Sequence, residues 1–363
     1  MNKCFLVTGG SGFIGSNFIR NLLSKFDLDI VINLDNLSLN SNINNLRDIT
    51  SEKYIFYKGD INDRNLVLDI LSKHKVDTIV HFAAESHVDR SILDPLKFFS
   101  TNILGTQNLL ECFKNYLENK NENIYNFRFI HVSTDEVYGS LKKDSPAFTE
   151  KTQYKPNSPY AASKASSDHI VRSYFKTYNL PINITNCSNN YGPYQFPEKL
   201  IPLVINNCLN NQPIPIYGNG EQIRDWIHVQ DHCDALLKII ETKSIGKKFN
   251  IGGNSEFSNL EIVKNICKIM DFHFPNTNSN SYNNLIKFVN DRPGHDFRYA
   301  LNIDKIYNEL QWKPKIKLKE GLESTIKWYL DNRQWIKSAT QNKDYKFWID
   351  KNYKHRGILK QER

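Results

Sequence analysis

The sequence lacks any run of about 18 apolar residues, the length that a membrane-spanning helix needs. Its first residues also lack the features of a secretory signal peptide. Met1-Asn2-Lys3 is followed by only a short apolar stretch before glycines interrupt it, and no small-residue cleavage pattern follows. We therefore expect a cytoplasmic protein that does not bind membranes.

Paired cysteines are absent as well. None of the cysteines forms a Cys-x-x-Cys pair, and no histidine cluster lies near them in the sequence. The six are Cys4, Cys112, Cys187, Cys208, Cys233 and Cys267. This pattern indicates free thiols in a reducing compartment and no metal site.

A concentrated block of positive charge is the third absence. The formal net charge is +8, but the lysines are spread along an Asn- and Lys-rich chain rather than gathered in one segment. Such a distribution is typical of a solvated surface and argues against a nucleic-acid partner. A mild positive field would still suit an anionic substrate that carries phosphate groups.

Short apolar runs alternate with longer amphipathic stretches in the first half of the chain. The 363 residues are 40% hydrophobic and 24% charged, an ordinary composition for a globular protein. The predicted strands are Cys4–Thr8, Asp29–Leu34, Tyr54–Tyr57, Thr78–Phe82, Phe127–Ser133 and Ile182–Cys187. The predicted helices are Ile14–Phe26, Asn65–His74, Pro95–Tyr116, Tyr160–Tyr178 and Glu198–Asn210. The alternation predicts an α/β fold with a Rossmann-type, doubly wound parallel sheet.

This rhythm weakens after Tyr191-Gly192-Pro193, where loops rich in Pro, Gly and Asn separate shorter elements. We expect a first domain over residues 1–190, to which segments near residues 226–252 return. Residues 191–363 are expected to form mainly a smaller, mixed α/β domain that binds the substrate.

A glycine-rich loop follows the first predicted strand and opens the first predicted helix. Gly9, Gly12 and Gly15 stand at G-x-x-G-x-x-G spacing, a variant of the dinucleotide-binding fingerprint. Such glycines let the backbone approach a pyrophosphate, and the helix N-terminus supplies N–H donors. Asp35 ends the second strand 20 residues after Gly15, where a carboxylate accepts hydrogen bonds from ribose and repels a 2′-phosphate. The pattern predicts NAD rather than NADP.

Two further strand ends fit the same cofactor. Asp60-Ile61 follows the third strand, where it could bracket an adenine ring. Ala83-Ala84-Glu85-Ser86-His87 follows the fourth, and its small residues leave room for a ligand at the carboxyl edge of the sheet. Close packing of a helix against the strand is an alternative explanation for Ala83 and Ala84.

Tyr160 and Lys164 are four residues apart in a predicted helix, so both lie on one face. An ammonium beside a phenol favours the phenolate, which a tyrosine needs in order to act as a base near neutral pH. Thr134-Asp135-Glu136 follows the fifth strand, at the edge where active-site groups lie in this architecture. A helix N-cap is an equally good explanation of that triplet taken alone.

Together these segments resemble the extended short-chain dehydrogenase/reductases, the NAD-dependent epimerase/dehydratase family. The resemblance also covers the run from His81 to Ser91 and the segment Asn189–Pro193, and it extends from Leu6 to the region of Asn352-Tyr353. Within the family the chain is similar to the dTDP-glucose 4,6-dehydratases, because epimerases and simple reductases lack the paired carboxylates.

The resemblance implies that dTDP-glucose becomes dTDP-4-keto-6-deoxyglucose plus water. In this mechanism Tyr160 takes the proton of the 4-hydroxyl, helped by Thr134 and Lys164, while a hydride passes to NAD. Glu136 then removes the C5 proton as base, and Asp135 protonates the departing 6-hydroxyl as acid. The hydride finally returns to C6, and C5 is reprotonated. Two neighbouring carboxyls with opposite tasks need different pKa values.

The resemblance also implies two sets of binding residues. For NAD they are Gly9, Gly12, Phe13, Ile14, Gly15, Asp35, Asn36, Leu37, Ser38, Asp60, Ile61, Ala83, Ala84, Ser86, Thr101, Tyr160, Lys164 and Asn190. For the nucleotide sugar they are His87, Thr134, Asn189, Lys199, Leu200, Pro215, Tyr217, Arg224, Asn259, Arg292 and His295. The two arginines match phosphate oxygens in geometry, although a surface ion pair is the commoner role of an arginine.

One segment departs from the family pattern. After Asp35-Asn36-Leu37-Ser38 the family commonly continues Tyr-Ala-Gly-Asn, whereas this chain reads Leu39-Asn40-Ser41-Asn42. The surroundings of the adenosine ribose are therefore expected to differ.

Several alternatives remain at this point. UDP-glucose 4,6-dehydratase shares the chemistry, whereas a 4-epimerase, a decarboxylase of this family or a non-catalytic NAD-binding protein would not need the paired carboxylates. The product leads to rhamnose or to other deoxysugars. Family members usually pair through two helices, so we expect a homodimer through Pro95–Tyr116 and Tyr160–Tyr178. Leu104, Leu109 and Ile170 would permit this, although a buried core explains them equally well.

Overall fold

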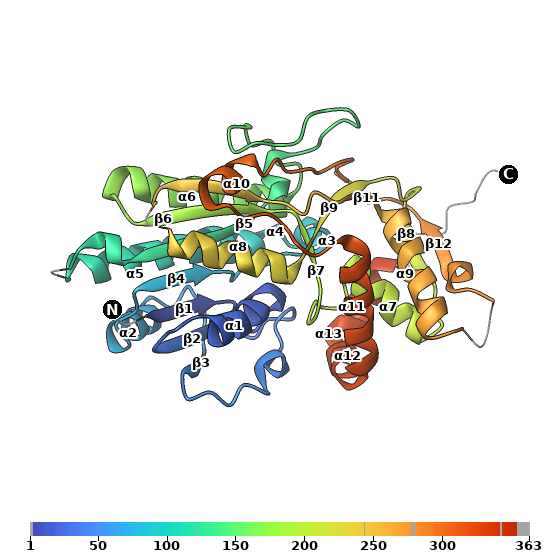
Figure 1. Cartoon of the computed structure of the whole chain (residues 1–363), viewed down its shortest axis with the longest axis horizontal. Coiled ribbons are helices and arrows are strands. Elements are labelled where there is room, and N and C mark those ends of the chain that lie inside the picture. The colour runs from blue at the N-terminus through green and yellow to red at the C-terminus, as the bar shows by residue number, and fades with distance from the viewer. Residues whose placement is uncertain (1–2, 121, 243, 277–279, 342, 354–363) are drawn as a thin grey trace.

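The computed structural model describes residues 3–120, 122–242, 244–276, 280–341 and 343–353 (Figure 1). Its main element is a seven-stranded sheet with the strand order β10-β6-β5-β4-β1-β2-β3, in which all neighbouring strands run parallel. The strands are β1 (Cys4–Thr8), β2 (Ile30–Asp35), β3 (Tyr54–Lys58), β4 (Thr78–His81), β5 (Arg128–Thr134), β6 (Ile182–Cys187) and β10 (Lys247–Ile251). The predicted parallel α/β sheet is confirmed.

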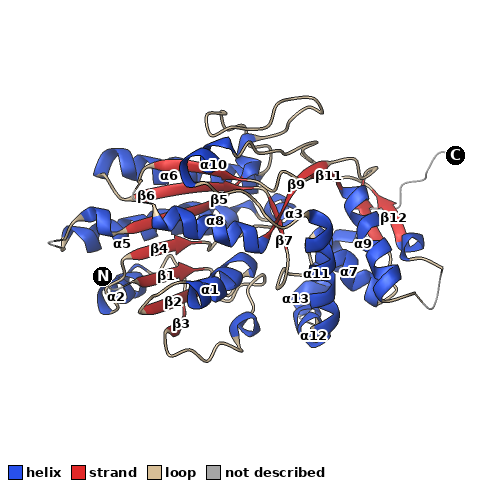
Figure 2. Ribbon diagram, viewed as in Figure 1, coloured by secondary structure: helices blue, strands red, loops and turns tan. Residues whose placement is uncertain are grey.

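Helices cover both faces of this sheet because its strands are apolar on both sides (Figure 2). The core on one face includes residues of α1 (Phe13–Lys25), α8 (Val229–Glu241) and α10 (Asp304–Leu310). The core on the other face includes residues of α2 (Arg64–Lys73), α5 (Thr106–Glu118) and α6 (Pro159–Tyr178). Burial on both faces explains why the strands read as continuous apolar runs rather than alternating ones.

The six predicted strands agree with the structure to within a single residue at either end. The predicted helix Pro95–Tyr116 consists of α4 (Pro95–Phe98), a π-helical segment η2 (Phe99–Gly105) and α5. The seventh strand, β10, was not among the predicted strands. It begins with two lysines and follows the part of the chain where the regular alternation weakens.

A smaller part lies beside the carboxyl edge of the sheet, at the right of Figure 1. It contains a three-stranded sheet and a two-stranded sheet around a separate apolar core. Its strands are β7 (Asn189–Tyr191), β8 (Ile214–Tyr217), β9 (Ile223–His228), β11 (Glu256–Ser258) and β12 (Ile286–Val289). Its helices are α7 (Leu200–Leu209), α9 (Asn259–His273), α11 (Leu318–Asp331), α12 (Arg333–Thr340) and α13 (Lys343–Tyr353).

The remaining short elements are α3 (Val88–Leu93) and the 3-10 turns η1 (Ile43–Leu46), η3 (Ile124–Asn126), η4 (Asp135–Tyr138) and η5 (Tyr282–Leu285). The loops after β1, β2, β4, β5 and β6 all leave the sheet at its carboxyl edge, which is the ligand-binding edge of open α/β sheets.

All six cysteines are buried, and none forms a disulfide. Among the described residues, no group of three or more His, Cys, Asp or Glu side chains is placed to hold a metal ion. Within the same described ranges, no helix has both the length and the apolar character to span a bilayer.

Candidate active site

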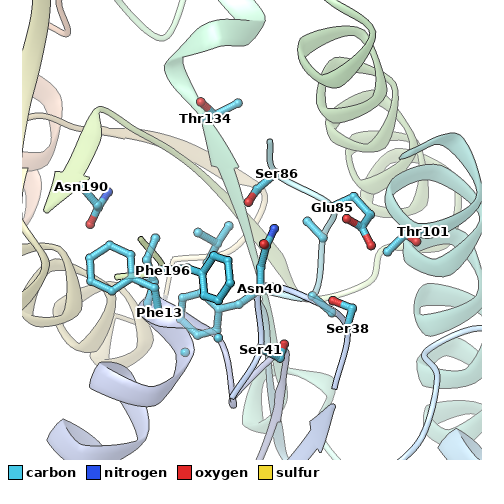
Figure 3. Close-up of a pocket in the computed structure, with 18 of the residues that line it drawn as sticks. Phe13, Ser38, Asn40, Ser41, Glu85, Ser86, Thr101, Thr134, Asn190 and Phe196 are labelled. Atoms are coloured by element: carbon cyan, nitrogen blue, oxygen red, sulfur yellow. The ribbon is translucent and has the colours of Figure 1, made fainter. Parts of the chain in front are cut away.

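A cavity of about 270 Å³ lies at the carboxyl edge of the main sheet (Figure 3). It extends from the loop after β2, where Ser38 and Ser41 lie, to Thr134 at the end of β5. Sixteen of the eighteen residues predicted for NAD line it, together with Thr134, Asp135 and Glu136. The exceptions are Leu37 and Asp60.

Both exceptions support the wall of the cavity rather than forming it. The backbone N–H of Leu37 donates to Oδ1 of Asp35 at 2.8 Å. The carboxylate of Asp60 accepts hydrogen bonds from the side chains of Asn36 and Asn62. Leu37 and Asp60 therefore orient neighbouring groups in the loops after β2 and β3.

The glycine loop has the geometry that the fingerprint requires. Gly9 has a φ of +70°, and a Cβ atom there would lie 2.6 Å from the backbone nitrogen of Ala83. A Cβ atom on Gly15 would collide with the carbonyl oxygen of Gly9. Gly12, the N-cap of α1, has no side chain to occupy the N–H groups at the start of the helix. The loop thus leaves a helix N-terminus open to an anionic group.

Asp35 is buried at the end of β2, where its carboxylate accepts N–H groups from Ser11 at 2.9 Å and from Leu37. Burial raises the pKa of Asp35, while hydrogen bonds from Leu37, Ser41 and Ser11 act in the opposite direction. Ser41 belongs to the segment that departs from the family pattern, and Ser41 and Asn40 both line the cavity. The departure therefore lies directly at the proposed ribose site.

Thr134 ends β5, and its hydroxyl accepts the N–H of Glu136 at 3.3 Å, so it caps the η4 turn. The cap does not exclude a catalytic role, because the same hydroxyl lies on the cavity wall and 3.3 Å from Oδ1 of Asp135. The cap is therefore confirmed, and the catalytic role of Thr134 stays a prediction.

Asp135 and Glu136 lie in the same cavity but in different electrostatic surroundings. Burial raises the pKa of Asp135 well above its usual range, and the nearby carboxylates of Glu136 and Asp225 raise it further. Burial also raises the pKa of Glu136, but Arg292, Lys199 and Arg224 lower it. Asp135 consequently keeps its proton at a pH where Glu136 is more readily ionised. An acid and a base of this kind are what an elimination needs.

Tyr160 and Lys164 both line the cavity from α6. Lys164 donates from Nζ to the carbonyl of Val132 at 2.9 Å, and burial lowers its pKa to about 8. The pKa of Tyr160 is raised well above its usual value by burial, then by Glu136 and Cys187, while a hydrogen bond with Thr134 lowers it. The protein groups alone therefore do not make this phenol acidic, contrary to the simplest form of the sequence-based expectation.

A second cavity, of about 170 Å³, continues from the first toward the smaller part of the chain. Glu136, Asn189, Glu198 and Lys199 line both cavities, so the two meet at the predicted base. Ten of the eleven residues predicted for the nucleotide sugar line the second cavity, and the eleventh, Thr134, lines the first.

Arg292 and Arg224 differ in how many of their donors remain for a ligand. Arg292 is paired with Asp89 at 3.4 Å, and its buried Nε has no partner among the described residues. Arg224 donates to the carbonyls of Ile223 and Asp296. Arg292 therefore has a free donor for phosphate.

The two predicted histidines of the second cavity are uncharged near neutral pH. Burial is the largest cause that lowers the pKa of His87 to about 4. Burial also lowers the pKa of His295 to about 4, with Arg292 and Arg224 acting in the same direction. The Nδ1 atom of His87 is buried without a partner among the described residues, which suits a ligand contact.

Sequence reasoning missed several residues of both cavities. Those of the first are Leu34, Asn40, Ser41, Gly59, Phe82, Glu85, Val132, Ser133, Cys187, Ser188, Gln195, Phe196 and Glu198. Those of the second are Val88, Asp89, Glu198, Leu203, Ile216, Trp226, Tyr299 and Tyr353. Most of them are neighbours in the sequence of predicted residues, and this position next to a predicted residue could have indicated them. Tyr353 comes from α13 and could not be assigned to a cavity without the tertiary structure.

Comparison with known proteins identifies the family. The family model described as GDP-mannose 4,6 dehydratase matches residues 6–325. A dTDP-glucose 4,6-dehydratase of Shigella flexneri is 48% identical over 97% of this chain and 99% of its own. That of Haemophilus influenzae is 50% identical over 90% of this chain and 98% of its own.

A solved structure agrees with these relatives. The dTDP-glucose 4,6-dehydratase DesIV of Streptomyces venezuelae, solved with NAD bound, is 43% identical and has a TM-score of 0.84. The match covers 93% of this chain and 99% of that one. The chain therefore belongs to the dTDP-glucose 4,6-dehydratase family, among the NAD-dependent epimerases and dehydratases.

Proposed function

We propose that this protein is an NAD-dependent hydro-lyase that converts dTDP-glucose into dTDP-4-keto-6-deoxyglucose and water. The observation that carries the proposal is the pair of carboxyls at Asp135 and Glu136, which share a cavity with Tyr160 and have differently tuned pKa values. A reductase or an epimerase needs a single proton acceptor at C4. The elimination of water across C5 and C6 also needs an acid and a base.

The first cavity fits NAD on the evidence of its own groups. A Cβ atom on Gly9 or Gly15 would collide with the backbone of Ala83 or of Gly9, so the tight turn of this loop requires glycine. Asp35 offers a buried carboxylate to ribose hydroxyls. The hydroxyl group of Ser133 is buried without a partner among the described residues. NAD, when bound, supplies the hydride acceptor. We propose that residues 1–190 with the segments near 226–252 hold it, and that residues 191–363 mainly hold the nucleotide sugar.

The protein groups would divide the proton transfers among themselves. Tyr160 takes the proton of the sugar 4-hydroxyl, and Thr134 holds that oxygen in position. Glu136 removes the C5 proton once the 4-ketone has made it acidic. Asp135, which burial keeps protonated, gives its proton to the departing 6-hydroxyl. Lys164 places a positive charge near the phenolate that Tyr160 must form.

Incubation of the purified protein with dTDP-glucose tests the proposal. The expected product is a 4-keto sugar nucleotide whose absorbance appears on treatment with alkali, formed without added reductant. UDP-glucose, offered in competition, measures the preference for the base. Absence of product from both nucleotide sugars would reject the proposed function.

We also propose a cytoplasmic homodimer that pairs through α5 and α6 with the adjoining η2 segment. Leu104 in η2 is 59% exposed and Leu96 in α4 is 75% exposed, which suits a partner surface. Leu109 is fully buried and belongs to the core instead. Light scattering after size exclusion should give twice the chain mass, and Leu104→Lys should reduce it to one chain mass. Monomeric wild-type protein would contradict the dimer.

A further inference from the structure

A third ionisable residue continues the buried face of α6 that carries Tyr160 and Lys164. Asp168 lies four residues beyond Lys164, as Lys164 lies four beyond Tyr160, so all three share one side of the helix. Asp168 is 2% exposed, and Lys164 is 4% exposed. Asp168 lines neither of the two cavities described above. A carboxylate buried behind a catalytic pair therefore calls for a role other than substrate contact.

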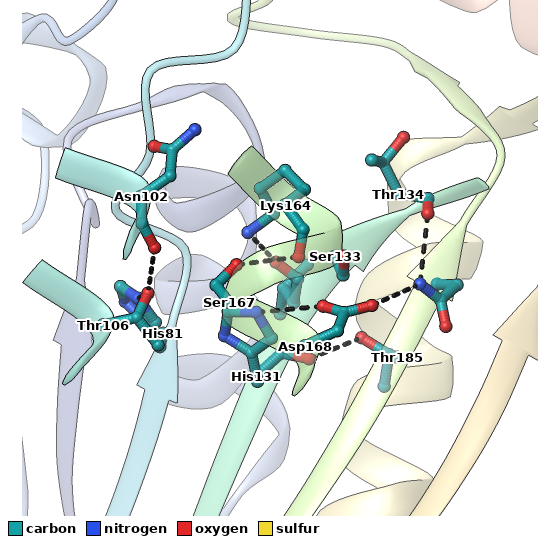
Figure 4. Close-up of polar contacts among 12 residues, drawn as sticks. His81, Asn102, Thr106, His131, Ser133, Thr134, Lys164, Ser167, Asp168 and Thr185 are labelled. Atoms are coloured by element: carbon teal, nitrogen blue, oxygen red, sulfur yellow. Dashed lines mark hydrogen bonds and ion pairs between the residues drawn. The ribbon is translucent and has the colours of Figure 1, made fainter. Parts of the chain in front are cut away.

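The contacts of Asp168 connect three elements of the fold (Figure 4). Its Oδ2 accepts hydrogen bonds from the hydroxyl of Tyr154 at 2.7 Å and from Nδ2 of Asn186 at 3.1 Å. Its Oδ1 lies 3.2 Å from Nε2 of His131 in β5. Asn186 in β6 also donates to the backbone carbonyl of Thr134 at 3.1 Å. Asp168 thus ties the helix of the Tyr160–Lys164 pair to the strand that carries the acid and the base.

Lys164 is the cation next to Asp168 on the buried face of α6, one helical turn away. Burial lowers the pKa of His131 to about 4, so this imidazole is neutral near neutral pH. Burial raises the pKa of Asp168, but His131, Lys164 and Tyr154 more than offset it, and the group is ionised. Burial lowers the pKa of Lys164, and the negative charge of Asp168 is the largest influence that raises it. The other ionisable groups that face this cluster are His81 in β4, Tyr138 in η4, Cys187 in β6 and Lys248 in β10.

We propose that Asp168 is a positioning residue, whose buried negative charge keeps Lys164 in its ammonium form and holds α6 in register with β5. The inference rests on the proposed function, because it concerns the pair that oxidises C4. It requires that the charge of Asp168, and not only its hydrogen bonds, support the oxidation. The chain offers a matched pair of variants that separates these two contributions.

Asp168→Asn removes the charge and keeps the shape, whereas Tyr154→Phe removes a hydrogen bond to the same carboxylate and keeps its charge. Each holoenzyme is mixed with dTDP-6-deoxyglucose, which has the C4 hydroxyl but no C6 hydroxyl to eliminate. The rate of the absorbance rise at 340 nm then reports C4 oxidation alone, without the contributions of Asp135 and Glu136.

In Asp168→Asn the loss of rate at high pH should begin about one pH unit or more below that of the wild type, because Lys164 loses its proton earlier. In Tyr154→Phe the high-pH limb should stay at its wild-type position. An unmoved limb in Asp168→Asn, or equal shifts in both variants, would overturn the proposal. Asp168→Ser, also neutral but smaller, replaces the asparagine variant if that protein does not fold.

The NAD content of each protein after desalting over the same pH range gives a readout that needs no sugar. As the pH is raised, Asp168→Asn should begin to lose its bound NAD at a lower pH than the wild type and Tyr154→Phe, because Lys164 loses its proton earlier. Failure of the wild type to oxidise the sugar would count against the proposed function alone. Identical retention profiles in all three proteins would count against the role of Asp168.

Discussion

Replacement of Asp135 by asparagine should remove activity and stabilise the fold at the same time. The amide has nearly the same shape as the carboxyl but has no proton to give to the departing hydroxyl. A positioned general acid contributes about 10²–10⁴-fold to the rate, so kcat on dTDP-glucose should fall by that factor. This loss corresponds to about 3–5 kcal/mol of activation free energy.

The stabilisation follows from the raised pKa of Asp135. In the unfolded chain this carboxyl should titrate near its ordinary value of about 3.9, whereas burial raises its pKa well above that value in the folded state. Between the two values the folded state binds more protons than the unfolded state, so stability falls as the pH rises through this window. Each unit by which the pKa is raised corresponds to about 1.4 kcal/mol, a cost that the asparagine variant does not carry.

Urea unfolding of the holoenzymes at pH 5 and pH 8 measures the second effect. The free energy of unfolding of Asp135→Asn should exceed that of the wild type by more than about 1 kcal/mol at pH 8, and by less at pH 5. Asp144→Asn, at an exposed position, is the control and should change neither property. A loss of kcat below about tenfold would refute the acid role. A destabilised variant at pH 8 would refute the argument from burial.

Three further predictions concern the base and the binding groups. Glu136→Gln should lower kcat about 10²–10⁴-fold and abolish the low-pH limb of the wild-type rate profile, because a raised pKa makes Glu136 lose its charge as the pH falls. Gly9→Ala should destabilise the protein by about 2 kcal/mol or more and remove its bound NAD. Gly12 has a negative φ, so Gly12→Ala should change the stability and the NAD content much less. A thermal melt and quantification of bound NAD measure the two effects. Arg292→Met should raise KM for dTDP-glucose about tenfold or more and move the low-pH limb upward, since Arg292 is the largest cause that lowers the pKa of Glu136. An unchanged limb in that variant would contradict the assigned coupling.

The main sheet was predictable from the sequence because its strands are buried on both faces. Continuous apolar runs such as Cys4–Thr8 and Ile182–Cys187 give a clear signal, and the helices between them bury one apolar side each. The strand Lys247–Ile251 was missed because only part of it is buried. This strand joins the main sheet by pairing with β6, which lies far away in the sequence, and the local sequence does not encode that pairing.

The candidate site was predictable for a different reason. Glycine spacing, Asp35 and the Tyr160–Lys164 pair are local patterns with direct chemical meaning. The loop at Asn40 and Ser41 was recognised as different, but its position on the cavity wall depends on how the backbone turns after β2. Tyr353 reaches the second cavity only because α13 packs back onto it, which is a property of the tertiary fold.

The pKa values of Asp135 and Glu136 are set by different neighbours. Asp135 is kept protonated by burial and by the neighbouring carboxylates of Glu136 and Asp225. Burial raises the pKa of Glu136, and the cations Arg292, Lys199 and Arg224, all in the second half of the chain, offset part of that rise. The protonation of Asp135 is therefore set mainly by burial, while the ionisation of Glu136, the proposed base, also depends on the cations that surround the second cavity. A diphosphate bound to Arg292 would partly neutralise the positive charge that lowers the pKa of Glu136. Substrate binding should therefore raise the pKa of Glu136 and make it a stronger proton acceptor.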